Sequence, residues 1–309
     1  FIKTFLFFYY YFFINYHLTM VGKMETTSGK TIPQYFLDKG INHFSPTQAS
    51  YPLDVWLYKY WHCDKQKRDN FKKSSKMRCG TLAGDSVAAD ITRNVRPLFH
   101  YDGYKDWDDF EDQKQWENDK ENINATIEQI FLGLKDVGVK WDDKRTKIVF
   151  EYPVSMQDPR LVVPIHGYTD IQTPTLLIEL KTTWSSNRIV GKKKDWTPEK
   201  GWTYSYKELP TKPNENHLQQ ASFYYFATKI PTVIIQANAK NYVPFYVKDY
   251  DYKEAYNNLV ISCMRKQEAA KLQNPFQVIE PKFEDFGRLK FWWDIGDKYL
   301  NEAKELYGY

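Results

Sequence analysis

Three ionisable residues on two neighbouring segments carry the strongest chemical signal in the sequence: Asp170, Glu179 and Lys181. Asp170 follows an apolar run at 161–165, and the other two lie inside the next run, at 176–181. Short aliphatic runs separated by Gln-Thr-Pro-Thr predict two adjacent strands with a tight connection. Because side chains alternate along a strand, Glu179 and Lys181 share one face.

These charges admit two interpretations. A Glu-x-Lys on a strand is often a local ion pair at a sheet edge. Two carboxylates that converge from neighbouring strands instead make an oxygen-rich site of the kind that Mg²⁺ or Mn²⁺ prefers. A lysine beside such a site could position or deprotonate a water, or stabilise charge on a phosphate under attack.

A helix expected after Pro213 carries a second group of polar side chains. His217, Gln220 and Tyr224 are spaced by three and four residues, which places them on one helix face. As an isolated observation, a glutamine and a tyrosine on such a stripe are a buried hydrogen-bond pair.

Together these residues resemble a known family. The spacing of Asp170 and Glu179-Leu180-Lys181 resembles the core of the PD-(D/E)XK nuclease superfamily. The Gly-Tyr-Thr that leads into Asp170 is similar to the Gly-x-x-Asp of its RecB-type exonuclease branch. The Gln-x-x-x-Tyr at 220–224 resembles that branch's accessory motif, and Ser45-Pro46 resembles the start of its first helix. The resemblance spans roughly residues 45–248.

The resemblance implies a fold class. We expect an α/β fold with a restriction-endonuclease-like PD-(D/E)XK core, in which helices flank a mixed central sheet. The runs at 147–154, 160–171 and 176–182 predict a three-stranded meander, and those at 232–237 and 242–247 predict a hairpin that completes the sheet.

The family's roles transfer to matching positions. Asp170 and Glu179, with the carbonyl of Leu180, would hold Mg²⁺ or Mn²⁺. Lys181 would orient or activate the attacking water and offset charge in the transition state. The glutamine and tyrosine of the accessory motif would steady the lysine and the scissile phosphate or strand end.

One position departs from the family. Relatives often carry a histidine ligand after Gly-Thr-x-x, whereas this chain has Gly84, followed by Asp85. Asp85 could replace the histidine as an oxygen ligand of the metal. It could equally be only the N-cap of a helix that opens at 80–91.

Two basic segments are candidates for DNA contacts. The run between Cys63 and Cys79 is either a solvated loop or a track for phosphates. The long connection at 184–215, which we expect to be irregular, combines lysines with aromatic residues and suits either a flap over single-stranded or frayed DNA or a mobile surface insertion. The residues expected to contact DNA are Lys72, Lys73, Lys76, Lys192, Lys193, Lys194 and His217.

Other helices are expected outside the motifs. Ser45 and Pro46 predict a helix start, with Ser45 as the N-cap. The acid-rich stretch at 101–138 predicts a solvated amphipathic helix without chemistry. The stretches at 252–272 and 283–307 predict helices that pack on the domain.

Composition predicts a globular chain. With 309 residues, 42% of them hydrophobic, it is long enough to bury a core, and we expect a single nuclease domain over 20–309 with an N-terminal helical part and a C-terminal helix. The net charge of +4 does not demand a polyanionic partner, so DNA contacts must come from local patches. Three widely spaced cysteines without Cys-x-x-Cys argue against the iron–sulfur cluster of some relatives. They predict free thiols in a reducing compartment, here a bacterial or phage-infected host cytoplasm.

The first residues have a membrane-like composition. The apolar run at 5–14 is short for a spanning helix and is crowded with tyrosine. We expect residues 1–19 to be a non-native leader or a disordered segment, with the biological start at Met20 or Met24 and no membrane association. A real N-terminal anchor is the alternative.

The expected function follows from the resemblance. It is a Mg²⁺- or Mn²⁺-dependent DNA exonuclease of recombination, repair or degradation, similar to the stand-alone enzymes of phages. The partner would be DNA, with a single-strand annealing protein or a helicase alongside. The alternatives are a non-cleaving DNA-binding or scaffold module on the same fold, and an endonuclease of the same superfamily.

Overall fold

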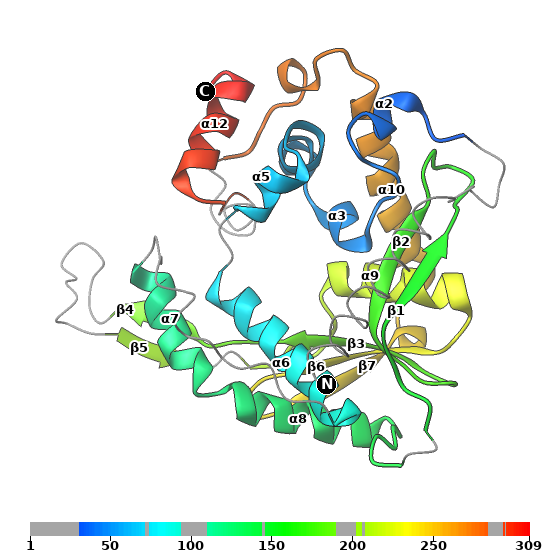
Figure 1. Cartoon of the computed structure of the whole chain (residues 1–309), viewed down its shortest axis with the longest axis vertical. Coiled ribbons are helices and arrows are strands. Elements are labelled where there is room, and N and C mark those ends of the chain that lie inside the picture. Colours follow the sequence, from blue (N-terminus) through cyan, green and yellow to red (C-terminus); the bar gives the residue numbers. More distant parts are fainter. Residues whose placement is uncertain are drawn as a thin grey trace, which may run out of the picture.

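A computed structural model gives the chain a five-stranded central sheet in the order β1-β2-β3-β6-β7 (Figure 1). It describes residues 31–71, 74–93, 110–143, 146–189, 202–205, 208–283, 293 and 295–309. The strands are β1 (Val149–Met156), β2 (Ile165–Gln172), β3 (Leu177–Thr182), β6 (Thr232–Ala237) and β7 (Tyr242–Tyr246). Neighbours are antiparallel except for β3 and β6, which are parallel. The mixed sheet, its meander and its closing hairpin are therefore confirmed.

The parallel pair β3–β6 accounts for the position of α9 (Glu215–Thr228). Parallel neighbours need a crossover connection, and α9 lies within it. The same connection contains an antiparallel ribbon of β4 (Ser186–Ile189) and β5 (Trp202–Ser205). The prediction of a wholly irregular segment at 184–215 was therefore wrong for these strands.

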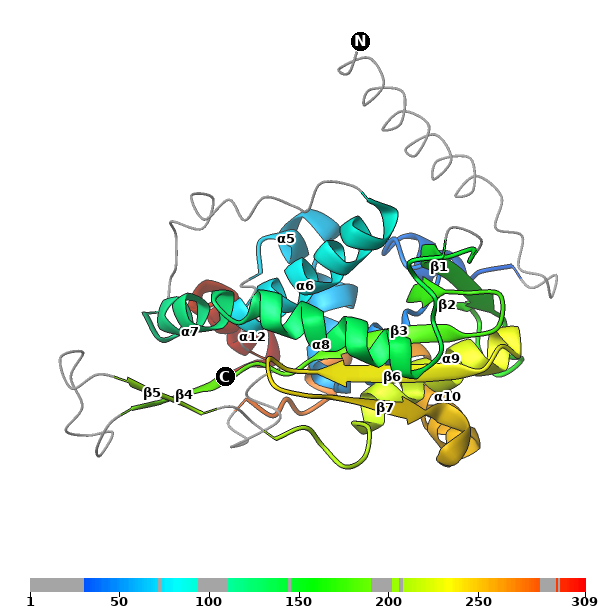
Figure 2. The same ribbon diagram turned by 90° about the horizontal axis from the view of Figure 1, so that it is seen from below.

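Helices cover both faces of the sheet (Figures 1 and 2). They are α6 (Ser75–Thr92), α7 (Phe110–Lys120) and α8 (Ile123–Asp136) on one face, and α9 and α10 (Tyr252–Ala270) on the other. Alternation along β6 sets this arrangement. Val233 and Ile235 pack among side chains of α6 and α8, whereas Ile234 between them packs with Ala221 of α9. Both faces of β6 are buried, which explains its continuous apolar run.

Short helices from the two halves of the chain meet beside this core (Figure 1). They are α2 (Gln34–Leu37), α3 (Pro46–Ser50), α4 (Leu53–Trp56), the π-helix η1 (Leu57–His62), α5 (Lys65–Asp69), the 3₁₀-helix η6 (Pro275–Gln277) and α12 (Asp297–Tyr307). A second 3₁₀-helix, η5 (Val247–Asp249), follows β7 and contacts α9 and β6 instead. Trp293 and Ile295 share a buried cluster with Val55. The Tyr307 hydroxyl donates to the carbonyl of Asp54 at 2.6 Å, which fastens α12 to α4.

Several predicted helix boundaries are confirmed. The Ser45 hydroxyl accepts a hydrogen bond from the Gln48 amide at 3.0 Å and caps α3, although that helix ends at Ser50. Helices α9 and α10 begin as expected, and α12 covers the end of the predicted C-terminal helix. The acid-rich stretch forms two helices, α7 and α8, instead of one, and Gly138 (φ +83°) follows the second.

The predicted first residue of helix α6 was wrong. The helix begins at Ser75, where Ser74 accepts the capping hydrogen bond from the Met77 amide, and not near residue 80. Asp85 therefore lies in the middle of α6 and is not an N-cap. The segment between Cys63 and Cys79 is correspondingly not one loop, since it contains α5 and the first turn of α6.

Two further predictions concern the whole chain. Cys63, Cys79 and Cys263 are buried, free thiols. Within the described residues, the helices are all too short or too polar to span a bilayer. Residues 1–19, for which we expected a leader or a disordered segment, lie outside the described residues.

Candidate active site

Asp170 lies where strands β2 and β3 separate. The two strands pair at Ile171 with Ile178 and at Gln172 with Leu177. At Asp170, the residue before these pairs on β2, the link between the two strands is made by a side chain and not by the main chain. Asp170 Oδ2 accepts a hydrogen bond from the Leu180 amide at 2.6 Å. The carboxylate is thereby held against the Glu-Leu-Lys segment of β3.

Glu179 and Lys181 point away from the α6–α8 face. Ile178 packs in the cluster of that face, and alternation turns its neighbour Glu179 toward α9. Glu179 is 2% exposed, and its Oε1 lies 2.6 Å from Lys181 Nζ. The predicted common face of the two charges is confirmed, and their ion pair is internal because β6 covers the other edge of β3.

A hydrogen-bonded chain joins α9 to both strands. Lys181 Nζ donates to Gln220 Oε1 at 3.3 Å, and Gln220 Nε2 donates to the Tyr224 hydroxyl at 3.0 Å. That hydroxyl donates to the main-chain carbonyl of Tyr168 on β2 at 2.6 Å. The structure thus brings the five residues expected to be catalytic into one connected group.

Gly167 permits the close approach of α9 to β2. A Cβ at this position would lie 3.1 Å from the Tyr224 hydroxyl oxygen and 3.0 Å from Pro46 Cδ. Steric crowding therefore explains why the Gly-x-x-Asp sequence has a glycine at position 167. Part of this crowding comes from Pro46, the first residue of α3.

The carboxyls of the site are shifted toward their neutral forms. Burial, followed by the charge of Asp170, raises the pKa of Glu179 to about 8. Burial likewise raises the pKa of Asp170. Burial alone would lower the pKa of Lys181, but the carboxylates of Glu179 and Asp170 outweigh it and leave that pKa above its ordinary value. Lys181 is therefore an ammonium ion at neutral pH.

One oxygen atom of the site is a candidate ligand for a cation. Glu179 Oε2 is buried and forms no hydrogen bond with the described residues, although the Gln220 side chain lies near enough to lower the pKa of Glu179. A buried carboxylate oxygen without a partner is costly, and a hard divalent cation satisfies it. Within the same part of the chain, no group of three or more Asp, Glu, His or Cys side chains has a metal-binding arrangement. The residues present fit a site with two carboxylates, completed by a main-chain oxygen such as that of Leu180.

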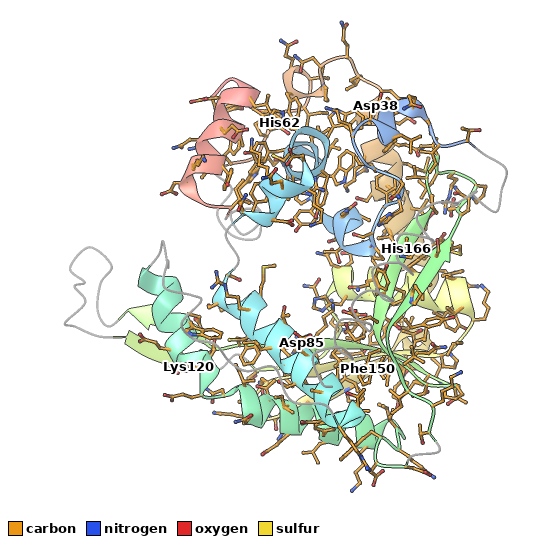
Figure 3. All side chains as sticks on the ribbon, viewed as in Figure 1. Asp38, His62, Asp85, Lys120, Phe150 and His166 are labelled. Carbon is orange, nitrogen blue, oxygen red and sulfur yellow. The ribbon has the colours of Figure 1, made fainter. Side chains whose placement is uncertain are left out.

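Asp85 and Glu151 extend the acidic character of the site. Asp85 is exposed on α6, near the start of β1, where Phe150 lies (Figure 3). Partial burial and then the charge of Glu151 raise the pKa of Asp85. Glu151 lies opposite Asp170 in the β1–β2 register, between the pairs that flank it, with φ +47°. Within the described residues, Asp85 forms no hydrogen bond or ion pair with Asp170. Glu151 was not among the predicted site residues.

The residues expected to contact DNA are only partly described. Lys72, Lys73, Lys192, Lys193 and Lys194 lie outside the described residues. Lys76 is in the first turn of α6. In the neighbouring part of the basic run, Lys67 pairs with Glu302 of α12 and Arg68 donates to the carbonyl of Cys63 at 2.6 Å. These two cations therefore have local partners.

His217 lies beside the lysine of the site. Burial and then the charge of Lys181 lower the pKa of His217 to about 4. The ring is therefore neutral at physiological pH, and it would contact a phosphate only through an N–H. Its position on the face of Gln220 and Tyr224 is confirmed.

A buried aspartate anchors the chain after β3. Asp119 Oδ1 accepts hydrogen bonds from the Ser185 hydroxyl at 2.6 Å and from its amide at 3.2 Å. Gln115 also donates to Asp119 and to Ser185. The acid-rich stretch therefore has a structural function that its sequence did not indicate.

Comparisons with known proteins leave the family open. The chain matches no protein-family model, and no curated protein matches it. Among solved structures, one described as "Crystal structure of SSO0001" is 14% identical and covers 54% of this chain and 80% of that one. Its TM-score is 0.26, too low to carry an argument about this chain.

Proposed function

We propose that this protein is a metal-dependent DNA exonuclease with a PD-(D/E)XK core. The observation that carries the proposal is the grouping of Asp170, Glu179 and Lys181, with the unsatisfied buried oxygen of Glu179 among them. A structural ion pair would account for the lysine and one carboxylate oxygen. It would not account for the second carboxylate or for the oxygen without a donor.

The carboxylates are the proposed metal ligands. Asp170 and Glu179, with the carbonyl of Leu180, would hold Mg²⁺ or Mn²⁺, since both ions favour oxygen ligands. When bound, the ion supplies Lewis-acid stabilisation of the negative charge on a phosphodiester. No iron–sulfur cluster is part of the proposal.

Lys181 contributes positive charge at a fixed position. Its raised pKa makes it a hydrogen-bond donor, so it would orient the attacking water and offset charge at the phosphate. Gln220 limits the movement of the ammonium group, and the Tyr224 hydroxyl fixes the glutamine. This arrangement positions the donor before substrate arrives, which is the condition for effective electrostatic stabilisation.

One observation favours a second function, a non-cleaving DNA-binding or scaffold module. Gly84 stands where relatives of the resembled family carry a histidine ligand, and Asp85, among the residues that the structure describes, forms no hydrogen bond or ion pair with Asp170. Isothermal titration with Mg²⁺ and Mn²⁺ separates the two functions. Heat of binding that Asp170→Asn abolishes supports the nuclease, and its absence from the wild-type protein supports the scaffold.

DNA of different topology tests the proposed reaction. The protein is incubated with end-labelled linear duplex, end-labelled single strands and covalently closed circular DNA, each with Mg²⁺ or with a chelator. An exonuclease releases nucleotides from linear DNA only with the metal and spares the circle. Cleavage of the circle would identify an endonuclease instead, and cleavage in the chelator would contradict metal dependence. An annealing protein or a helicase alongside remains a prediction.

A further inference from the structure

Tyr168 exposes an aromatic ring beside the proposed site. Tyr168 is 43% exposed, although its two neighbours on β2 are buried. It precedes Asp170 by two residues, so the two side chains share one side of the strand. Their Cα atoms are therefore about one strand repeat of 6–7 Å apart.

One histidine contacts this ring, and a second histidine contacts the first. The ring of His166 meets that of Tyr168 edge to face, with 5.0 Å between centroids and an angle of 89°. His43 contacts His166 in the same manner at 5.2 Å. His166 is 9% exposed and lies on β2 near α3 (Figure 3). The tyrosine is thus supported on its protein side and open on the other.

Hydrogen bonds connect the main chain of Tyr168 to the proposed catalytic residues. Its carbonyl accepts the hydrogen bond from Tyr224, which is bonded through Gln220 to Lys181. A ligand on the tyrosine ring would therefore be held at a fixed position relative to the lysine.

The two β1 residues that lie opposite this part of β2 are uncharged. Pro153 lies opposite Tyr168 in the β1–β2 register, Ser155 lies opposite His166, and both β1 residues are exposed. We call Pro153, Ser155, His166 and Tyr168 the β1–β2 strip. Without a lysine or an arginine, the strip has nothing to attract a phosphate. An exposed ring without a lysine or an arginine in its strip instead suits the flat face of a nucleobase.

We infer that Tyr168 stacks on the base adjacent to the phosphodiester held at Asp170 and Lys181. Because a paired base inside a duplex has both faces covered by its neighbours, the ligand would be an unpaired strand or a frayed end. The inference rests on the proposed function for the identity of the ligand. It adds a residue that selects single-stranded DNA.

Abasic substitution tests the contact directly. Affinity for a short fluorescent oligonucleotide is measured by anisotropy with Ca²⁺ in place of Mg²⁺, and a single abasic sugar is moved along the strand. For the wild-type protein we expect one position at which the missing base weakens binding by roughly 5- to 100-fold. Tyr168→Ala should weaken binding of the intact strand by the same factor, and the abasic sugar at that position should then have no further effect.

Matched variants separate stacking from general damage. Tyr168→Phe keeps the ring and should bind as wild type, whereas Tyr168→Leu keeps bulk and should bind as the alanine variant. Trp141 is similarly exposed, at 37%, and contacts Phe131, so Trp141→Ala is the control and should not change binding.

Each outcome bears on one claim. If Tyr168→Ala and Tyr168→Leu bind the intact strand as wild type does, or if the abasic effect persists unchanged in them, the stacking inference is overturned. That result leaves the proposed nuclease function intact when the wild-type protein still digests linear DNA. Stacking without any digestion would sustain the inference and contradict only the proposed hydrolysis.

Discussion

The Asp170 carboxylate accepts a hydrogen bond from the main-chain amide of Leu180, across the point where β2 and β3 separate. The bond makes one side chain both a structural link and a proposed metal ligand. Asn can accept the same bond through its carbonyl oxygen, but Ala cannot. The two substitutions therefore separate the structural contribution from the chemical one.

We predict that Asp170→Ala lowers the free energy of unfolding by about 1–3 kcal/mol more than Asp170→Asn does, because it leaves the amide of Leu180 without its partner. Both variants should lose Mg²⁺ binding. Urea denaturation and titration calorimetry measure the two effects. Equal stability of the two variants would show that the bond contributes nothing to the fold.

Glu179 should couple metal binding to stability. At a Mg²⁺ concentration of 100 times the dissociation constant, one site on the folded state adds about 2.7 kcal/mol. We expect Mg²⁺ to raise the melting temperature of the wild-type protein, and Glu179→Gln to abolish that increase. Glu128→Gln, at an exposed position of α8, is the control and should retain it. An increase that survives in Glu179→Gln would place the metal elsewhere.

Two glycines should respond oppositely to alanine. A Cβ at Gly84, inside α6, meets no atom within 4 Å, so Gly84→Ala should stabilise the protein by about 0.5–1 kcal/mol. Gly167→Ala should cost about 1–3 kcal/mol, because its Cβ crowds Tyr224 and Pro46. It should also slow DNA digestion by displacing the tyrosine. Thermal denaturation distinguishes the two, and a stabilising Gly167→Ala would refute the close approach of α9 to β2.

A buried lysine outside the site should make stability depend on pH. Lys266 is 1% exposed, and its Nζ donates to the Ala49 carbonyl at 2.9 Å and to Ser262 Oγ at 2.8 Å. Burial lowers the pKa of Lys266 from 10.5 to about 8. Below pH 8 both the folded and unfolded chains are charged here, and the folded state bears the cost of burying the ammonium ion. Between pH 8 and 10.5 the unfolded chain holds more protons, so stability rises with pH in that window.

The matched variant is Lys266→Met, which keeps the volume and leaves the Ala49 carbonyl its bond from Ser262 at 2.6 Å. We expect this variant to be more stable than wild type at pH 7. The free energy of unfolding of the wild type should rise by on the order of 3 kcal/mol between pH 8 and 10.5, and that of the variant should not. The measurement is urea denaturation of both proteins from pH 7 to 10.5. The same pH dependence in both would show that Lys266 is not its source.

The parts of the site that sequence could predict depend on short-range periodicity. The common face of Glu179 and Lys181 follows from alternation along a strand, and that of Gln220 and Tyr224 follows from the helical repeat. The start of α3 follows from local capping by Ser45. Each of these relationships lies within a few residues, where spacing and secondary structure determine geometry.

The parts that sequence did not predict depend on register and on distant contacts. Glu151 faces Asp170 only because β1 and β2 pair in one particular register. Asp119 and Ser185 are 66 residues apart, and nothing near either one indicates their bond. Asp85 lies inside a helix because α6 begins ten residues upstream, after the N-cap Ser74, and the residues next to Asp85 do not indicate that earlier start.

The most direct test of the proposed site is digestion of end-labelled linear DNA with Mg²⁺ by wild type, Lys181→Ala and Lys135→Ala, the last an exposed lysine at the end of α8. We predict that the wild type and Lys135→Ala digest the DNA at the same rate, and that Lys181→Ala is slower by at least about a hundredfold while its circular dichroism spectrum is unchanged. Digestion by Lys181→Ala at the wild-type rate would contradict the assignment of this group as the catalytic site.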